Sequence, residues 1–240
     1  MILSAHQLNY LPYPGLIAKI NYSDKFLYLS NIQFEKKSWQ SRNKMMNNGS
    51  EILLSIPIKN KNKIQLIKDV EINNEINWKK KHLKTIRYNY KKAKYFKRYI
   101  KFFEKLYENN WIKLNEITEY ILLYVMKELN IKTEIVSDKN YNFKEKKNDF
   151  LIEMCKKFDA TAYVSNKGSE DYIDLTIFKK NKINHYFVSY KNYIYIQQNN
   201  KKFVNNLSIF DMMFNCGPDE TEKIIKNKMN LVISKNLQYL

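Results

Sequence analysis

The thirty residues MILSAHQLNYLPYPGLIAKINYSDKFLYLS, positions 1–30, decide the fold class. Met1 to Ala5 form a short apolar run that is typical of a buried strand, and Lys25 to Ser30 form a second run rich in strand formers. Between the two runs, residues 14–22 have the pattern of a short helix, with Pro14 near its start, where proline is favoured. A strand, a helix and a strand in this order predict an α/β fold.

Later segments extend this pattern. The run ILLSIPI, residues 52–58, predicts a third strand within Glu51–Ile58, and a basic, aromatic helical segment follows at about residues 76–130. Helices and short strands alternate from residue 150 onward. We therefore predict a single α/β domain over residues 1–240. It has a mixed sheet, flanking helices and a basic helical segment inserted after the first three strands.

Three predictions concern the last third of the chain. Residues 193–197 have the composition of a late strand. The run LSIFDMMFN, residues 207–215, predicts a helix that ends at Gly217 and Pro218, because glycine and proline are typical of helix ends. The segment from Glu220 to Ile233 is expected to form a separate surface helix.

The charge of the chain is strongly positive. Its 240 residues include 42 Lys and Arg against 24 Asp and Glu, a formal net charge of +18. Such a balance favours anionic partners: nucleic acid, acidic membrane surfaces or phosphorylated small molecules. Arginine, whose planar guanidinium binds phosphate and guanine through two hydrogen bonds, is scarce. Lysine is spread over every segment, so much of the charge can be solvated surface.

Several function classes lose support. No stretch approaches the roughly 18 apolar residues of a membrane span, and residues 1–30 lack the order of a signal peptide, so we expect a cytoplasmic protein. Cys155 and Cys216 are far apart, and the three histidines lack metal-ligand spacing, so we expect buried thiols and no metal. With four glycines there is no phosphate-binding loop motif, and we expect no tightly bound cofactor.

Polar side chains follow the first predicted strand: His6, Gln7, Asn9 and Tyr10. Sites of α/β folds are built where strands end. An imidazole titrates near neutrality, which makes His6 a natural general base. An equally good interpretation is a histidine that only hydrogen-bonds the turn before Pro12.

A second polar cluster, NIQFEKKSWQSRNK, spans residues 31–44. Its cations, Lys36 and Arg42 among them, could contact a phosphate, and Trp39 could stack on a base or a sugar ring. A mixed-charge run is usually solvated surface. The position directly after a strand favours a binding role here.

His82 lies in the basic aromatic segment, four residues after Trp78, so on a helix the two share a face. This arrangement is more often packing than catalysis. The aromatics that alternate with lysines over Lys79–Lys105 could equally form a stacking platform for single-stranded nucleic acid.

Taken together, several segments resemble the WbqC-like family, bacterial proteins encoded among genes for surface polysaccharide biosynthesis. The resemblance is found in HQLNYLPYPGLIAKI, FLYLSNIQFEKKSWQSRNK, WKKKHLKTIRYNYKKAKYF, YVSNKGSEDYID and LSIFDMMFN. The chain departs from the family pattern at Leu8, where proline is usual, at Tyr13, where tryptophan is usual, and at Asn166, where glycine is usual.

The resemblance implies a transferase that acts on a nucleotide-linked amino sugar, with an acyl group as cargo and acyl-coenzyme A as cosubstrate. Under this interpretation His6 is the base, Tyr10 supports the imidazole or donates to the leaving thiolate, and His82 is the reserve base. The oxyanion donor is Gln7, Asn9 or a backbone N–H at the strand end. The remaining assignments place Lys36 and Arg42 on phosphate, Trp39 or Tyr90 on a ring, Asn9, Gln33 and Asn43 on hydroxyls or carbonyls, and Asp174 and Asp211 on either histidine.

Two other classes compete with the enzyme. A nucleic-acid-binding protein would explain the charge, and a noncatalytic scaffold of a polysaccharide assembly complex would fit the family setting. Both leave the clusters after the first two strands without a role. We therefore favour the enzyme, with no specific nucleic-acid partner. A homodimer is compatible with this prediction, because dimers are common among soluble enzymes, but the sequence does not select an oligomeric state.

Overall fold

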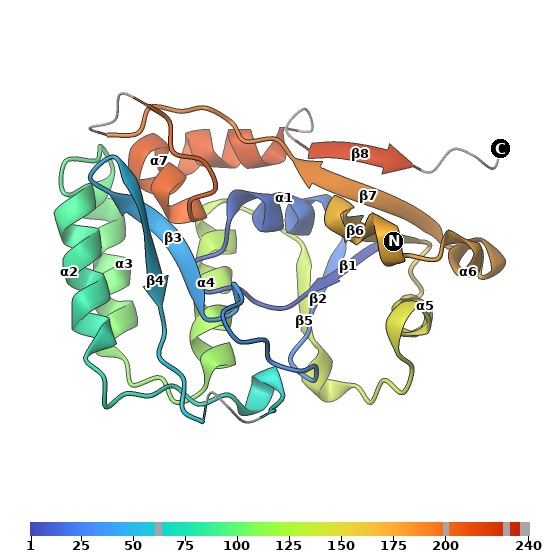
Figure 1. Cartoon of the computed structure of the whole chain (residues 1–240). Coiled ribbons are helices and arrows are strands. Elements are labelled where there is room, and N and C mark those ends of the chain that lie inside the picture. Colours follow the sequence, from blue (N-terminus) through green and yellow to red (C-terminus); the bar gives the residue numbers. More distant parts are fainter. Residues whose placement is uncertain (61–63, 199–201, 228–230, 236–240) are drawn as a thin grey trace.

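The strand–helix–strand unit at residues 1–30 forms as predicted in the computed structural model of the chain (Figure 1). The structure describes residues 1–60, 64–198, 202–227 and 231–235. Its strands are Ile2–His6 (β1), Lys25–Tyr28 (β2), Arg42–Asn47 (β3), Ser50–Ser55 (β4), Glu134–Ser137 (β5), Ala162–Asn166 (β6), Asn184–Tyr190 (β7) and Leu231–Lys235 (β8). Its helices are Pro14–Tyr22 (α1), Trp78–Tyr90 (α2), Phe96–Glu108 (α3), Leu114–Glu128 (α4), Lys147–Lys157 (α5), Leu175–Lys180 (α6) and Ile209–Lys226 (α7), with short 3₁₀ turns at Ile67–Asp69 (η1), Asp138–Asn140 (η2) and Lys167–Tyr172 (η3).

The main sheet has the strand order β5-β2-β1-β6-β7-β8, with β1 near its centre. The first five of these strands are parallel to one another, and β8 is antiparallel to β7. The predicted mixed α/β class is therefore confirmed. Because parallel strands align their carboxyl ends, the residues that follow β5, β2, β1, β6 and β7 meet at one edge of the sheet.

Helices cover both faces of the sheet. This agrees with β1, whose side chains point alternately to the two faces and are buried on each. Leu3 and Ala5 point to the face covered by α5 and α6, where they pack with Cys155 and Phe178. The other face contributes to the larger core, which includes α1, α4 and α7 and such residues as Ile17. Side chains alternate between the two faces of a strand, so His6 points to the face of α1.

The hairpin formed by β3 and β4 is a separate two-stranded sheet. The predicted strand at Glu51–Ile58 belongs to it, and its partner is β3, whose sequence RNKMMN is too polar to suggest a strand. The helical segment α2–α4 therefore follows four strands in the chain. Figure 1 shows the hairpin lying along α2, away from α5 and α6.

The last third of the chain differs from its predictions in three places. The helix at LSIFDMMFN continues beyond Gly217, which has a φ of 81° and makes a kink within α7. The segment predicted as a helix from Glu220 to Ile233 is helical through Lys226, and its residues 228–230 lie outside the described residues. Residues 231–235 instead pair with β7 as β8. Residues 193–197 form no strand.

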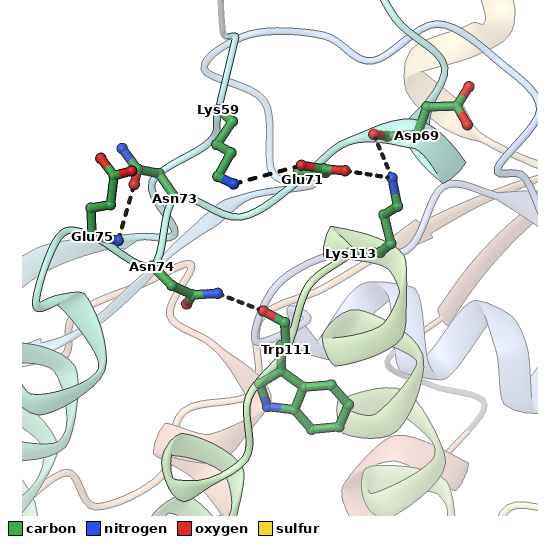
Figure 2. Close-up of polar contacts among 8 residues, drawn as sticks. All are labelled: Lys59, Asp69, Glu71, Asn73, Asn74, Glu75, Trp111 and Lys113. Atoms are coloured by element: carbon green, nitrogen blue, oxygen red, sulfur yellow. Dashed lines mark hydrogen bonds and ion pairs between the residues drawn. The ribbon is translucent and has the colours of Figure 1, made fainter.

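Polar contacts fasten the segment between β4 and α2 to the start of α4 (Figure 2). The carboxylate of Glu71 lies 3.1 Å from the ammonium of Lys113 and 3.7 Å from that of Lys59. Asn74 donates to the carbonyl of Trp111 at 2.8 Å. These exposed pairs individually contribute little stability, but together they fix the path of the segment that contains η1.

Candidate active site

The topological switch point of the sheet lies between β1 and β6. From β1 the chain passes through α1 to β2 on one side, and it returns much later to β6 on the other side. In open α/β sheets, ligands bind at the carboxyl ends of the strands at such a point. His6 is the last residue of β1, so its imidazole stands at this position.

His6 is held as a neutral imidazole. Its Nδ1 lies 2.7 Å from the carbonyl oxygen of Gln7. Because a carbonyl only accepts, Nδ1 has the hydrogen and Nε2 keeps a lone pair. Burial and the nearby charge of Lys19 lower the pKa of His6 to about 4. The side chain can therefore accept a hydrogen bond or a proton at neutral pH.

Lys19 of α1 is the residue that the sequence reasoning missed. Its side chain is 2% exposed, and its ammonium donates to the carbonyl oxygen of Ala5 at 3.1 Å. No carboxylate in the described part of the chain forms an ion pair with it, and burial lowers its pKa to about 7. A lysine is almost never buried unpaired unless it has a task. The detectable signal was a lysine inside the apolar helical run GLIAKI.

The segment after His6 packs against the second polar cluster. The backbone N–H of Tyr10 lies 3.1 Å from the carbonyl of Trp39 and 3.2 Å from that of Gln40. Asn43 donates to the carbonyl of Leu11 at 2.7 Å. The two clusters that the sequence singled out therefore meet at the end of β1. Asn43 is buried and engaged with backbone, whereas its predicted partners were hydroxyls or carbonyls of the substrate.

Two polar groups at this meeting point lack partners among the described residues. The Oε1 of Gln40 and the Nε of Arg42 are buried without a hydrogen bond, and Arg42 forms no ion pair. Asn9 is 4% exposed. An unsatisfied buried polar group costs about 1–3 kcal/mol, and such groups are concentrated at functional sites.

Three other predicted contacts lie on the outer side of the same loop. Gln33, Lys36 and Trp39 are exposed, Trp39 to 47%. Gln33 also forms an isolated backbone bridge with Leu66. These side chains are accessible to a ligand.

Tyr10 and His82 do meet, but in the core. The Tyr10 hydroxyl lies 2.9 Å from Nδ1 of His82 and 2.6 Å from the hydroxyl of Tyr107. Trp78 packs edge-on against His82. Burial lowers the pKa of His82 to about 4 and raises that of Tyr10. With Tyr10 at 0% exposure, this group is a hydrogen-bonded core network rather than an accessible acid–base pair.

Tyr90 and the two predicted aspartates also have structural partners. Asp211 is fully buried and accepts hydrogen bonds from Tyr90 at 2.7 Å, Tyr195 at 2.7 Å and Gln197 at 3.0 Å. Asp174 caps α6 by accepting from the backbone N–H of Thr176 at 2.9 Å. Neither carboxylate contacts a histidine, because each is satisfied by other donors. Tyr90 lies in the core and offers no ring face to a ligand.

Another buried histidine, His185, is hydrogen-bonded to a serine on the opposite face of the sheet. Nε2 of His185 lies 3.0 Å from Oγ of Ser165, and both side chains are buried. Aromatic rings surround the imidazole, with Phe178 and Phe187 each 4.5 Å away between ring centroids. Burial lowers the pKa of His185 to about 4. This enclosed setting favours a structural hydrogen bond over a nucleophilic serine.

A small cavity of about 220 Å³ lies beside the switch point, between the start of α1 and the ends of β6 and β7. Its lining includes Gly15, Asn166, Lys167 and Tyr190. The register pairs Ser4 with Val164, and two residues further along each strand are His6 and Asn166. The cavity is therefore next to the end of β1.

The basic helices do not present the stacking platform considered above. Most of their large aromatic side chains are buried, including Tyr90, Tyr99, Phe103 and Tyr107. Tyr88 is the exposed exception, at 65%. Base stacking requires accessible rings, so the aromatic pattern is explained by core packing.

Other chemistries find little support in the described residues. No three His, Cys, Asp or Glu side chains of this part of the chain come together as metal ligands would. Burial raises the pKa of both thiols, Cys155 and Cys216, to about 12, so neither is a thiolate at neutral pH. None of the helices described is long and apolar enough to cross a bilayer.

Comparison with known proteins finds a matching family and a distant relative. The model of the WbqC-like protein family matches residues 7–223. A protein of Mycobacterium tuberculosis, named uncharacterized protein Rv1507c, is 26% identical over 215 residues, which is 89% of this chain and 93% of the relative. No solved structure gives a significant match.

Proposed function

Because the chain belongs to the WbqC-like protein family, we propose that it is a transferase of surface-polysaccharide biosynthesis that N-acylates a nucleotide-linked amino sugar. The acyl donor in this proposal is an acyl-coenzyme A, a cosubstrate. The family setting supports the substrate class. The pair formed by His6 and Lys19 supports the reaction type.

The observation on which the reaction type depends is a neutral imidazole beside a buried lysine at the sheet switch point. Acyl transfer to an amine needs a group that removes a proton as the amine attacks. The lone pair on Nε2 of His6 can accept this proton, since Nδ1 is engaged with Gln7. Deprotonation of Lys19, whose pKa is about 7, removes the charge that lowers the basicity of His6.

The proposed reaction balances without a further reactant. The sugar amine attacks the thioester carbonyl, a C–N bond forms, and one amine proton passes to Nε2 of His6. The tetrahedral intermediate then collapses with cleavage of the C–S bond, and the thiolate takes the proton from His6. The products are an amide and free coenzyme A.

Polar groups near the end of β1 suit the charge that develops on the carbonyl oxygen. Gln7 and Asn9 offer amide N–H donors, and the guanidinium of Arg42 is without an ion pair among the described residues. Donors aimed at an oxyanion contribute several kcal/mol to catalysis. Both substrates of the proposed reaction contain a diphosphate. In the proposed complex, Arg42 and the exposed Lys36 contact the phosphates of one of the two substrates, and Trp39 stacks on a ring of the same molecule.

The test is an assay of purified protein with acetyl-coenzyme A and a panel of nucleotide-linked amino sugars. We expect release of free thiol and a product that mass spectrometry identifies as the N-acetylated sugar. His6→Ala should abolish turnover while the fold is retained. His185→Gln, which alters a buried histidine outside the site, is the matched control and should retain activity. Full activity of the His6 variant would remove it from the mechanism.

A further inference from the structure

A second and larger cavity lies at the carboxyl edge of the sheet, beyond β2 and β5. Its volume is about 720 Å³. Three segments form its walls: residues 31–32 after β2, Lys68 of η1, and residues 138–147 with Phe150 between β5 and the first turns of α5. None of the residues predicted from sequence to bind substrate lines it.

The charge of this cavity is strongly unbalanced. Its lysines are Lys68, Lys139, Lys144, Lys146 and Lys147. Within the described chain, none of these five ammonium groups takes part in an ion pair. The acidic residues of the lining are Asp138 and Glu145.

Asp138 forms no ion pair with these lysines in the described part of the chain, because its carboxylate is bound by other donors. It is 1% exposed and accepts from the backbone N–H and hydroxyl of Ser30, at 2.8 and 2.6 Å, and from the N–H of Asn31 at 2.8 Å. Its role is to join the loop after β2 to the end of β5. The two walls of the cavity are therefore fixed relative to each other.

The wall that contains Lys68 is fixed as well. The backbone N–H of Lys68 donates to the carbonyl of Ser30 at 3.0 Å, and that of Ile67 donates to Ile32 at 3.0 Å. The ion pairs of Glu71 hold the segment that follows (Figure 2). Lys68 is thus presented from an anchored turn, which limits the conformational entropy lost when a ligand binds.

Aromatic rings form part of the opposite wall. Tyr141, Phe143 and Phe150 line the cavity and are half-buried. The rings of Tyr141 and Phe143 stack at 5.8 Å, and those of Phe143 and Phe150 meet edge-on at 5.4 Å. Unpaired lysines beside accessible aromatic rings are the features that recognise phosphates and a nucleobase together.

We propose that this cavity binds a nucleoside diphosphate, with the lysines around the phosphates and the aromatic rings on the base. The proposal deepens the function proposed above, and rests on it for the ligand's origin. The same chemistry occurs in a nucleotide-linked sugar and in coenzyme A. The loop after β2 leads to the cavity, and Leu29 in it donates its N–H to the carbonyl of His6 at 3.0 Å. A diphosphate held there leaves the rest of the molecule free to extend along the sheet edge toward His6.

Titration calorimetry with uridine diphosphate, coenzyme A, pyrophosphate and uridine tests the assignment. The double variant Lys68→Glu/Lys139→Glu should weaken uridine diphosphate binding about tenfold or more. The control Lys84→Glu/Lys101→Glu makes the same change of charge on exposed helical positions and should alter the affinity less than about twofold. Equal losses in both variants would show that only overall charge matters, and would overturn the proposal.

Phe143→Ala separates the two halves of the site. It should weaken uridine diphosphate but leave pyrophosphate binding unchanged, because only the nucleoside needs the ring. Unchanged affinity for both would overturn the assignment of the aromatic wall. Tighter binding of coenzyme A than of uridine diphosphate would assign the cavity to the acyl donor, and the reverse order would assign it to the nucleotide-linked sugar.

The two proposals can fail separately. Binding that depends on Lys68 and Lys139 without any acylated product would refute the transferase and leave the nucleotide site standing. Acyl transfer with an unchanged KM for both substrates in the double variant would refute the cavity assignment and leave the transferase standing.

Discussion

The ammonium of Lys19 lies 3.1 Å from the carbonyl oxygen of Ala5, the residue that precedes His6 at the end of the central strand. A helix residue thereby places a buried positive charge beside the imidazole most suited to act as a base. The charge costs stability and lowers the pKa of His6. The first predictions follow from this pair.

Replacing Lys19 with methionine should stabilise the protein at pH 7 by about 1–3 kcal/mol. The pKa of Lys19 is lowered from 10.5 to about 7 in the folded state, so the folded protein binds this proton less tightly than the unfolded chain does. The free energy of unfolding is therefore highest above pH 10.5, and it decreases as the pH falls from 10.5 to 7. Urea unfolding measures the change. Lys84→Met, at an exposed position, is the control and should change stability by less than about 0.5 kcal/mol. A less stable Lys19 variant would mean that its bond to Ala5 outweighs the cost of burial.

The pH dependence of the rate should report Lys19 indirectly. We expect kcat/KM to rise with pH through about 7, because the neutral amine no longer lowers the basicity of His6. Lys19→Met should remove this inflection, while any inflection from the substrate amine stays. NMR titration should also show a higher pKa for His6 in the variant. A rate profile identical in both proteins would make Lys19 a structural residue only.

Buried histidines should make the fold sensitive to acid. Burial lowers the pKa of His185 from 6.5 to about 4, so its contribution to stability is present above pH 6.5 and is lost as the pH falls toward 4. Between pH 7 and pH 5 this one residue accounts for about 2 kcal/mol. His185→Gln should therefore lose less stability over that interval than the parent chain, as measured by urea unfolding at each pH. Equal losses of unfolding free energy in the variant and the parent chain would show that the imidazole of His185 is solvated in the folded state.

Gly217→Ala should destabilise the protein by about 2 kcal/mol or more. The φ of Gly217 is 81°, and an added Cβ would lie 2.4 Å from the ring of Tyr95. Gly168→Ala is the matched control, since a Cβ there meets nothing within 4 Å. Thermal unfolding of the two variants should separate them clearly. Equal melting temperatures would indicate that α7 can straighten and that Tyr95 can move.

Local sequence patterns were sufficient for the β1–α1–β2 unit, because its two apolar runs and the helical segment between them lie within thirty residues. They were insufficient for β3, which owes its strand conformation to pairing with β4 rather than to its own polar residues. The kink in α7 was missed for a related reason. Glycine and proline usually end a helix, but here packing of Gly217 against Tyr95 allows a second helical stretch to follow.

Prediction of the site was limited by contacts distant in sequence. The hydroxyl of Tyr10 bonds to His82, 72 residues away, and Asp211 bonds to Tyr90, 121 residues away. Polar type alone could not show that these groups satisfy one another in the core. The position of His6 at a strand end was accessible from the sequence. The apolar run around Lys19 indicated a buried helix, but whether the lysine itself is buried depends on α1 packing between the sheet and α7.

The central position of β1 also determines how long this strand lacks one of its partners during synthesis. Its partner on one side, β2, lies within thirty residues, but its other partner is β6, and the contact between Met1 and Thr161 spans 160 residues. At ribosomal speeds of about 5–20 residues per second, one edge of β1 stays open for roughly 10–30 s. During that interval the apolar strand can pair with other nascent chains. Aggregation should therefore increase when the protein is overproduced at a slower elongation rate.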